Sequence, residues 1–302
     1  MSAGIDASIP RTDADRAKAH RAHWWREVGW RHVVAVVVSI YAVFPLVFIV
    51  SLAFSDPSKS STLAATPFKT VSTTNFSNLF ADGMFVKQLG NTLVIGIITA
   101  IGTVLMGGAA AYAFSRFRFS GRRVTLTSLL IIQMFPQLLS FVAIFLLIQT
   151  LGGVFPILGM NSVVAVICIY LGGALGVNTF LMYGFFNTVP ISLDEAAKID
   201  GATHAQIFWT IILRLVAPVL AVVGLLSFIT SFSEYVIARL ILVEPAHKTV
   251  AVSLYDLVGG TLNPLWGQFA AGATLSALPV LLLFLFLQRY IVSGLTAGSV
   301  KG

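Results

Sequence analysis

Charged residues are scarce in this sequence, and it has a single cysteine. Charged side chains make up 10% of the 302 residues and hydrophobic ones 57%, whereas a soluble domain is about 25% charged and about 45–50% apolar. The one cysteine, Cys168, lies in an apolar run and can form neither an intrachain disulfide nor a cysteine-built metal cluster. The composition therefore excludes an ordinary soluble domain and indicates a chain that lies mostly in a membrane.

Motifs for catalysis and nucleotide binding are also missing. The sequence has no G-x-x-x-x-G-K-[ST] phosphate loop, no H-E-x-x-H and no G-x-S-x-G, and its five histidines are scattered. We therefore expect no enzymatic activity, no metal and no cofactor on this chain, and we disfavour a membrane-embedded enzyme. The net charge of +7 does not indicate a nucleic-acid partner, because the basic residues concentrate in short segments between apolar runs.

Long apolar runs dominate what is present. A transmembrane helix needs about 20 mostly apolar residues. The sequence predicts an all-α integral membrane protein with six spans, at 33–54, 89–114, 124–149, 162–186, 217–240 and 268–290. Most of the 19 lysines and arginines fall at the termini and after the second, fourth and sixth spans. Because positive charge favours the cytoplasmic side, both termini are predicted to be cytoplasmic.

This topology divides the chain into a basic cytoplasmic tail, a transmembrane domain and a short cytoplasmic tail, at 1–32, 33–290 and 291–302. Trp24, Trp25 and Trp30 lie among arginines just before the first span. They predict an interfacial helix with tryptophans at headgroup depth. A partly disordered basic tail is the alternative.

Two predicted spans carry polar residues at i, i+4, i+7 spacing, Gln133, Gln137 and Ser140 in the third and Ser227, Ser231 and Glu234 in the fifth. Each set shares a helix face, and Pro136 is expected to kink the third span. We expect a translocation pathway lined by Gln133, Gln137, Ser140, Ser231 and Glu234. Hydrogen bonding that only joins helices is the alternative. An ion-coupled secondary transporter that uses Glu234 is a competing hypothesis.

The segment LDEAAKIDGATHAQIF, 193–208, is an island of charge between apolar runs. Ser192 and Glu195 have the spacing of a capping box, which predicts a helix from about Leu193. Gly201 suits the end of this helix, and a second capping box, Thr203 to Gln206, starts an amphipathic helix. A rigid bent shape of this kind is typical of a docking surface for a cytoplasmic partner. An ordinary solvated helix is the alternative.

Several stretches resemble permease subunits of binding-protein-dependent ABC importers. EAAKIDGATHAQIFWTIIL (195–213) resembles their conserved cytoplasmic loop. Four others resemble the smaller permease subunit of the maltose and maltodextrin type: QMFPQLLSFVA (133–143), YLGGAL (170–175), LWGQFAAGATLSALP (265–279) and GLTAGSVKG (294–302). The resemblance implies the type I ABC importer permease fold in a bacterial plasma membrane, and transport of maltose or malto-oligosaccharide. Trehalose and other α-glucosides stay open.

The resemblance also implies partners. A cytoplasmic coupling segment, 191–215, would dock an ATPase through Glu195, Ala196, Ala197, Lys198, Asp200 and Gly201. ATP and magnesium would bind that ATPase, present in two copies, and a larger homologous permease would complete a heterodimer in the lipid. The outside loop, 241–267, would contact an extracytoplasmic solute-binding protein through Tyr255, Asp256, Gly259, Gly260 and Asn263. A packed re-entrant or surface loop is the alternative.

One position departs from the family pattern. Arg214 stands where the family usually has a proline, ahead of the retained Pro218. Arginine adds a positive charge and leaves a backbone N–H free, so the resemblance does not imply the angle of the turn into the fifth span.

Overall fold

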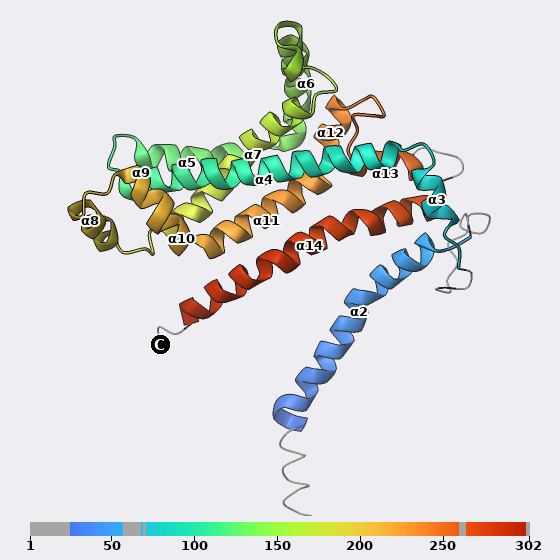
Figure 1. The fold of residues 1–302 in the computed structure, drawn as a ribbon, viewed down its shortest axis with the longest axis horizontal. Helices are drawn as coiled ribbons and strands as arrows, with labels where there is room; N and C mark the ends of the chain where they lie inside the picture. The colour runs from blue at the N-terminus through green and yellow to red at the C-terminus, as the bar shows by residue number, and fades with distance from the viewer. Residues whose placement is uncertain (1–24, 57–67, 69–70, 260–263, 300–302) are drawn as a thin grey trace, which may run out of the picture.

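The computed structural model describes residues 25–56, 68, 71–259 and 264–299, and every element within them is a helix (Figure 1). The longest helices are α2 (Trp30–Ala53), α4 (Met84–Arg116), α7 (Val163–Phe186), α11 (Ala217–Ser233) and α14 (Trp266–Ser299). The shorter ones are η1 (Trp25–Gly29), α3 (Thr74–Phe80), α5 (Arg122–Gln133), α6 (Gln137–Val154), η2 (Pro156–Leu158), α8 (Ile191–Ile199), α9 (His204–Gln206), η3 (Ile207–Ile212), α10 (Leu213–Leu215), α12 (Val236–Ile241) and α13 (Val250–Val258).

The centre of the fold is a bundle in which α4 packs against α7 and α11, and α14 packs against α11. Small residues allow these helices to approach closely. A Cβ atom added at Gly96 would lie 2.9 Å from the ring of Phe228 in α11, and one at Gly102 would lie 2.6 Å from Leu171 in α7. The C-terminal end of α2 meets the start of α14, and the N-terminal part of α2 lies away from the bundle (Figure 1).

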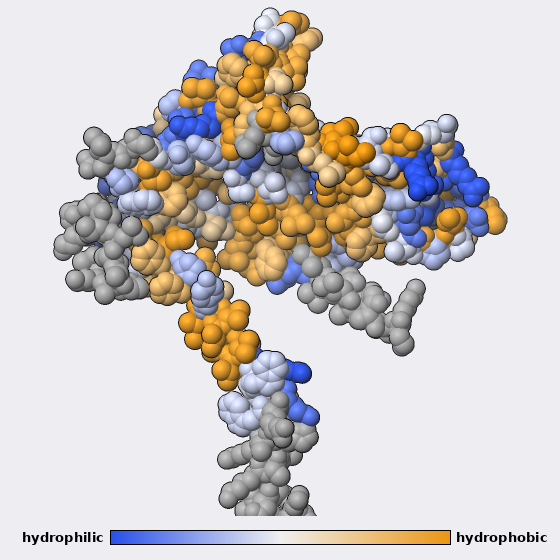
Figure 2. All heavy atoms as spheres, turned by 180° about the vertical axis from the view of Figure 1, so that it is seen from behind, coloured by the Kyte–Doolittle hydropathy of each residue, from blue (hydrophilic) through white to orange (hydrophobic). Residues whose placement is uncertain are grey.

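The two ends of the bundle differ in character. Helices α8, α9 and α10 gather at one end of α4, and α3, α12 and α13 lie towards the other (Figure 1). Figure 2 shows apolar side chains along the middle of the molecule and polar ones gathered at the end where α8 and α9 lie. Many large apolar side chains on α2, α4, α7 and α14 are exposed, as expected where lipid is the solvent.

The prediction of an all-helical membrane protein is confirmed, but six spans are not. Four helices are long and apolar enough to cross a membrane, in the ranges Glu27–Ala53, Met84–Arg116, Val163–Phe186 and Trp266–Tyr290. A fifth span is counted if the bent pair His204–Leu215 and Ala217–Ser233 is taken as one. These counts refer to the described residues.

The prediction of one kinked helix over 124–149 is wrong. Helix α5 ends at Gln133, a turn follows, and α6 begins after Pro136 and projects away from the bundle (Figure 1). Proline disfavours the helical conformation of the residue before it. The N–H of Phe135 bonds to the carbonyl of Ile132, three residues back, in place of the α-helical partner. Pro136 therefore breaks the chain into two helices rather than bending one.

Two other predicted boundaries also differ. The predicted span 217–240 is interrupted at Glu234, between α11 and α12. The last span was predicted to end at 290, but α14 continues to Ser299, so the proposed tail 291–302 lies mostly in helix. Trp25 and Trp30 lie in the continuous helical run η1–α2 and are exposed, while Trp24 and the rest of the basic tail lie outside the described residues.

Candidate functional site

The charged island forms a helix that begins differently from the prediction. Helix α8 begins at Ile191, directly after Pro190, whose backbone is extended (ψ 133°). No side chain caps the helix, so the predicted capping box between Ser192 and Glu195 is wrong. Proline at this boundary already sets the start of the helix, and Ser192 lies one residue inside the first turn.

The end of α8 follows local rules closely. Gly201 has φ +84°, the left-handed conformation that suits glycine. Its N–H donates to the carbonyl of Lys198 at 3.0 Å, and the N–H of Ala202 donates to that of Ala197 at 2.9 Å. These two bonds form a Schellman motif, which satisfies carbonyls at the helix end. The predicted glycine elbow is confirmed.

The second predicted capping box is also confirmed. The Thr203 hydroxyl accepts from the N–H of Gln206 at 3.3 Å, and the side-chain carbonyl of Gln206 accepts from the N–H of Thr203 at 2.8 Å. The helical run α9–η3–α10 then continues to Leu215 and meets α11 at an angle of 81°. Arg214 is exposed within this run, and the turn occurs at Val216, with Pro218 in the first turn of α11.

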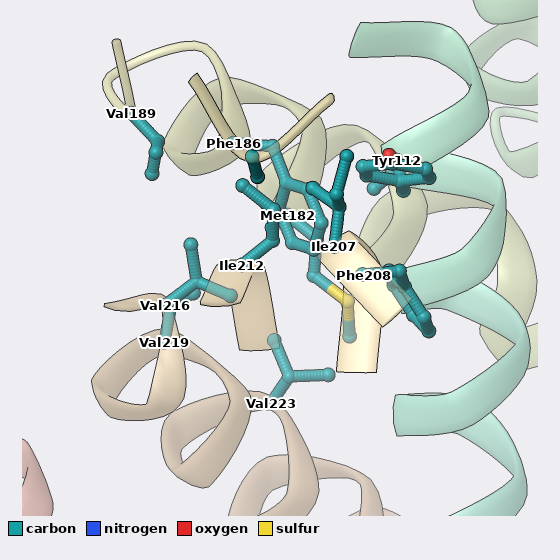
Figure 3. Packing of buried hydrophobic residues seen from close by; sticks show 12 residues of the cluster. Tyr112, Met182, Phe186, Val189, Ile207, Phe208, Ile212, Val216, Val219 and Val223 are labelled. Carbon is teal, nitrogen blue, oxygen red and sulfur yellow. The ribbon is translucent and has the colours of Figure 1, made fainter. Parts of the chain in front are cut away.

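The whole segment is packed onto the bundle by a cluster of buried apolar residues (Figure 3). Ile207, Phe208 and Ile212 are buried against side chains of α4 and α7, among them Tyr112 and Phe186. Burying one such aliphatic or aromatic side chain contributes about 1.5–3 kcal/mol. Helix α8 therefore sits on a firmly held base rather than on a free loop.

An ion pair adds a second connection. Arg116, the last residue of α4, places Nε 2.6 Å from a carboxylate oxygen of Asp194 in α8, and both side chains are 5% exposed. The same guanidinium donates to the carbonyl of Val189 at 3.0 Å and that of Phe186 at 3.3 Å. The sequence alone does not indicate this role for Arg116, because only the fold brings residues 116 and 194 together.

The predicted docking residues lie on both faces of α8. Glu195, Ala196, Lys198 and Asp200 are exposed, and so is Gly201 at the elbow. Ala197 is only 8% exposed and packs in the apolar cluster beneath the helix, so its side chain faces this chain's own core. Ile191, Leu193 and Ile199 are exposed apolar residues on the same helix, and Ile199 is 88% exposed. Apolar residues within a charged segment are a sequence signal for a contact surface, and this signal could have added these three residues to the predicted docking set.

Gln133, from the predicted translocation pathway, lies against α7. Its amide donates to the carbonyl of Gly173 at 2.8 Å. A Cβ at Gly176 would lie 2.5 Å from the same amide nitrogen, so this glycine makes room for Gln133. Ser140 is half-buried, and the side chain of Gln137 lies outside the described part.

Glu234 and Ser231 have partners within the protein. The Glu234 carboxylate accepts from the backbone N–H groups of Val236, Ile237 and Ala238 at 2.9–3.1 Å and so caps the start of α12. The Tyr170 hydroxyl also donates to it, at 2.5 Å. Ser231 is buried and donates to carbonyls of its own helix. Gln133 and Glu234 thus both bind α7, at residues 173 and 170, while Ser231 is turned into the bundle.

Loop 241–267 contains a packed helix. Helix α13 buries Val250, Val252 and Leu254 and packs against α4 and α14. On the same helix, the exposed Tyr255 packs against Tyr235, with ring centroids 4.7 Å apart and the ring planes tilted by 43°. A Cβ at Gly259 would lie 2.3 Å from the Tyr255 ring. Gly260 and Asn263 lie outside the described residues.

Asp256 joins this group through two cations. Arg239 bonds to one of its oxygens at 2.5 Å and Lys248 to the other at 2.6 Å. Burial is the largest single influence on the Asp256 pKa and raises it, but the bonds from Lys248 and Arg239 together outweigh burial and hold the pKa below its ordinary value of 3.8. Asp256 is therefore ionised at neutral pH and ties α13 to α12.

The segment leading into α13 is held by polar side chains of α4. Gln88 donates to the carbonyl of Pro245 at 3.0 Å, and Asn91 donates to those of Ala246 and Lys248 at 2.9 and 3.2 Å. The Thr92 hydroxyl accepts from the N–H of Val250 at 2.8 Å. Loop 241–267 is thus held to α4 over residues 245–250. Among the described residues, no group of three or more histidine, cysteine or acidic side chains could hold a metal ion.

Known structures share this arrangement of helices. A chain of a bacterial ABC transporter involved in the import of the acidic polysaccharide alginate superposes with a TM-score of 0.72, at 21% identity, over 94% of this chain and 99% of that one. A chain of the MetNI methionine ABC transporter gives 0.53 at 17% identity, over 72% of this chain and 97% of that one. The fold is therefore that of ABC transporter membrane subunits.

Sequence comparison gives the family. Residues 103–297 match the binding-protein-dependent transport system inner membrane component family, and the chain belongs to it. It is 38% identical to the maltodextrin transport system permease protein MdxG of Bacillus subtilis, over 88% of this chain and 93% of that protein. It is 46% identical to the maltose/maltodextrin transport system permease protein MalG of Salmonella typhimurium, over 71% and 72%. It is 36% identical to the galactooligosaccharides permease GanQ of Bacillus subtilis, over 90% and 94%.

Proposed function

We propose that this chain is a non-catalytic permease subunit of an ATP-driven sugar importer in the bacterial plasma membrane. In this proposal α8 is the docking site for a separate ATPase, which binds ATP and magnesium. The observation that carries the proposal is the two-sided character of α8. Its inner face is fixed to α4 and to the apolar cluster, while Glu195, Lys198 and Ile199 remain exposed.

The geometry suits the transfer of a movement. A partner that engages the exposed face of α8 can displace it, and the buried contacts then carry that displacement to α4 and α7. ATP-driven closure of two ATPase subunits would bring the docking helices together and favour one conformation of the spans over another. A larger homologous permease would supply the second docking helix.

Maltose or a malto-oligosaccharide is the proposed substrate. The support is the identity to MdxG and MalG, whose names specify maltodextrin and maltose. The identity to the galactooligosaccharides permease GanQ is similar, so the sugar has to be determined by experiment. Trehalose or another α-glucoside is the second candidate.

A solute-binding protein is the proposed outer partner. Loop 241–267 presents Tyr255 and Asp256 beside Arg239 on a packed helix, which makes a defined contact surface. One structural relative was determined in complex with an alginate pentasaccharide-bound periplasmic protein, and its chain matches this one with a TM-score of 0.61 at 17% identity.

The ion-coupled alternative is not favoured by the surroundings of its coupling residue. A coupling carboxylate must exchange partners during transport, whereas the Glu234 carboxylate accepts three backbone N–H bonds and one from Tyr170. Glu234 is better explained as the group that starts α12.

The test is uptake in cells that lack this chain and are complemented with variants. Uptake of radiolabelled maltose and maltotriose should return with the wild-type chain and not with residues 193–201 scrambled, provided the variant is present in the membrane at normal amounts. Labelled trehalose and galacto-oligosaccharide serve as competitors to rank the sugars. Normal uptake by the scrambled variant would refute the docking role of α8.

A further inference from the structure

Helix α4 makes polar side-chain contacts at both of its ends with the two surfaces proposed for partners. Near its start, Gln88, Asn91 and Thr92 hold the backbone of the segment that leads into α13. At its last residue, Arg116 holds α8. Figure 1 shows α13 and α8 at opposite ends of this helix.

We propose that α4 is the element through which the binding-protein surface of loop 241–267 and the ATPase-docking helix α8 influence each other, and that Arg116 is its positioning residue on the ATPase side. This inference rests on the proposed function. It adds a route within this chain by which binding at the outer surface would affect the ATPase at α8.

The contacts at the α8 end are suited to transmit small movements. Arg116 and Asp194 are both 5% exposed, so water does not screen the pair as it screens surface pairs. The guanidinium also reaches the backbone of residues 186 and 189, the chain that joins α7 to α8. A displacement of α8 away from α4 would leave a buried charge without its partner, which is costly, so the two helices are expected to move together.

At the start of α4 the contacts are hydrogen bonds to backbone atoms, and they also make the two elements move together. Side chains of α4 donate to the carbonyls of residues 245, 246 and 248, and one accepts from the N–H of residue 250. The position of this segment therefore depends on α4 and not on side-chain packing alone. Lys248 and Asp256 then connect this segment with α13 and the exposed Tyr255.

The route from α8 to α11 is less direct. The run α9–η3–α10 joins α11 through a bend of 81°, and it contains the π-helical segment η3. A bend and a π-helical turn can absorb displacement by local adjustment. Helix α4 is continuous over Met84–Arg116 and offers no such joint.

The experiment uses the complete transporter in lipid vesicles, with the ratio of ATP hydrolysis with and without the sugar-loaded binding protein as its readout. Arg116→Lys keeps the charge and removes the planar fork, and Asn91→Leu removes two bonds at the other end. Each should lower the stimulation ratio about 5–10-fold, a typical coupling between sites, while the ATPase still co-purifies. The double variant should be no worse than the poorer single variant, because both interrupt one route.

Matched controls change a similar group at the same end without touching these contacts. Arg123→Ala removes an exposed arginine near Arg116, and Asn78→Leu changes an exposed asparagine of α3; both should keep the wild-type ratio. If Arg116→Lys does not assemble, Asp194→Asn keeps the shape of the partner side chain and tests the same ion pair.

The outcomes separate the two claims. Wild-type stimulation in both single variants, or losses that multiply in the double variant, would overturn the role of α4. A wild-type complex in which the binding protein gives no stimulation would instead refute the proposed function, and the inference with it.

Discussion

The hydroxyl of Tyr170 lies 2.5 Å from the carboxylate of Glu234 and joins α7 to the junction between α11 and α12. Because three backbone N–H groups also donate to this carboxylate, it satisfies donors at the start of α12 that have no partner within the helix. The acidic residue that the sequence suggested as a coupling group is thus part of the framework.

Glu234→Gln should lower the thermal stability of the protein. Uptake by the wild-type chain should not depend on an ion gradient. Glutamine keeps the size but replaces an acceptor oxygen by a donor, so one or two charge-assisted bonds are lost, at about 1–3 kcal/mol. The midpoint temperature of thermal unfolding in detergent should fall, and Tyr170→Phe should lower it by a smaller amount. An ionophore-sensitive uptake by the wild-type chain that disappears in Glu234→Gln would contradict this account.

Gly201→Val should damage the elbow after α8, whereas Gly201→Asn should be tolerated. A Cβ added at Gly201 meets no atom within 4 Å, so space is not the constraint. The constraint is φ +84°, which costs an L-residue about 1–2 kcal/mol and which asparagine tolerates best. ATPase co-purification and sugar uptake should fall for valine and stay near wild type for asparagine. Equal loss in both variants would mean that the glycine serves close contact with a partner.

The sequence was sufficient where the structure depends on neighbours in the chain. Gly201 and the pair Thr203–Gln206 follow from local hydrogen-bonding rules, and both were predicted correctly. The break at Glu234 could not be predicted, because hydropathy over a window does not reveal that Tyr170, far along the chain, completes the cap.

The orientation of α8 was beyond the sequence for the same reason. Ala196 and Ala197 are identical residues, and only the contacts made by α4 and α7 decide that Ala197 faces inward. From the sequence, Arg116 is one of the basic residues that follow the second predicted span. Its partner Asp194 reaches it only in the folded chain. The pathway, docking and loop-contact roles stay predictions, as the fold positions these residues without a bound partner.

Substitutions at Ile199 and Ala197 should distinguish the docking role of α8 from its contribution to stability. Ile199 is 88% exposed, so Ile199→Glu should leave thermal stability within about 0.5 kcal/mol of wild type and weaken ATPase co-purification. Ala197→Leu would insert three carbons into a packed cluster and should cost about 1–3 kcal/mol. A normal association with the ATPase for Ile199→Glu, at normal amounts in the membrane, would remove this face of α8 from the docking surface.

Asp256→Asn should loosen α13 at neutral pH. Its folded-state pKa lies below the ordinary 3.8, so the ionised form is favoured by folding. That contribution is present above 3.8 and is lost as the pH falls through the lowered pKa. Each partly exposed ion pair with Arg239 or Lys248 is worth about 0.5–1 kcal/mol.

Amide hydrogen exchange of 248–258 should be several-fold faster in Asp256→Asn at pH 7. In the wild type the same faster exchange should occur only below pH 3.8. Arg239→Lys keeps the positive charge, so its exchange rate at pH 7 should lie between those of the wild type and Asp256→Asn. Unchanged exchange in Asp256→Asn would show that apolar packing of Val250, Val252 and Leu254 alone holds the helix.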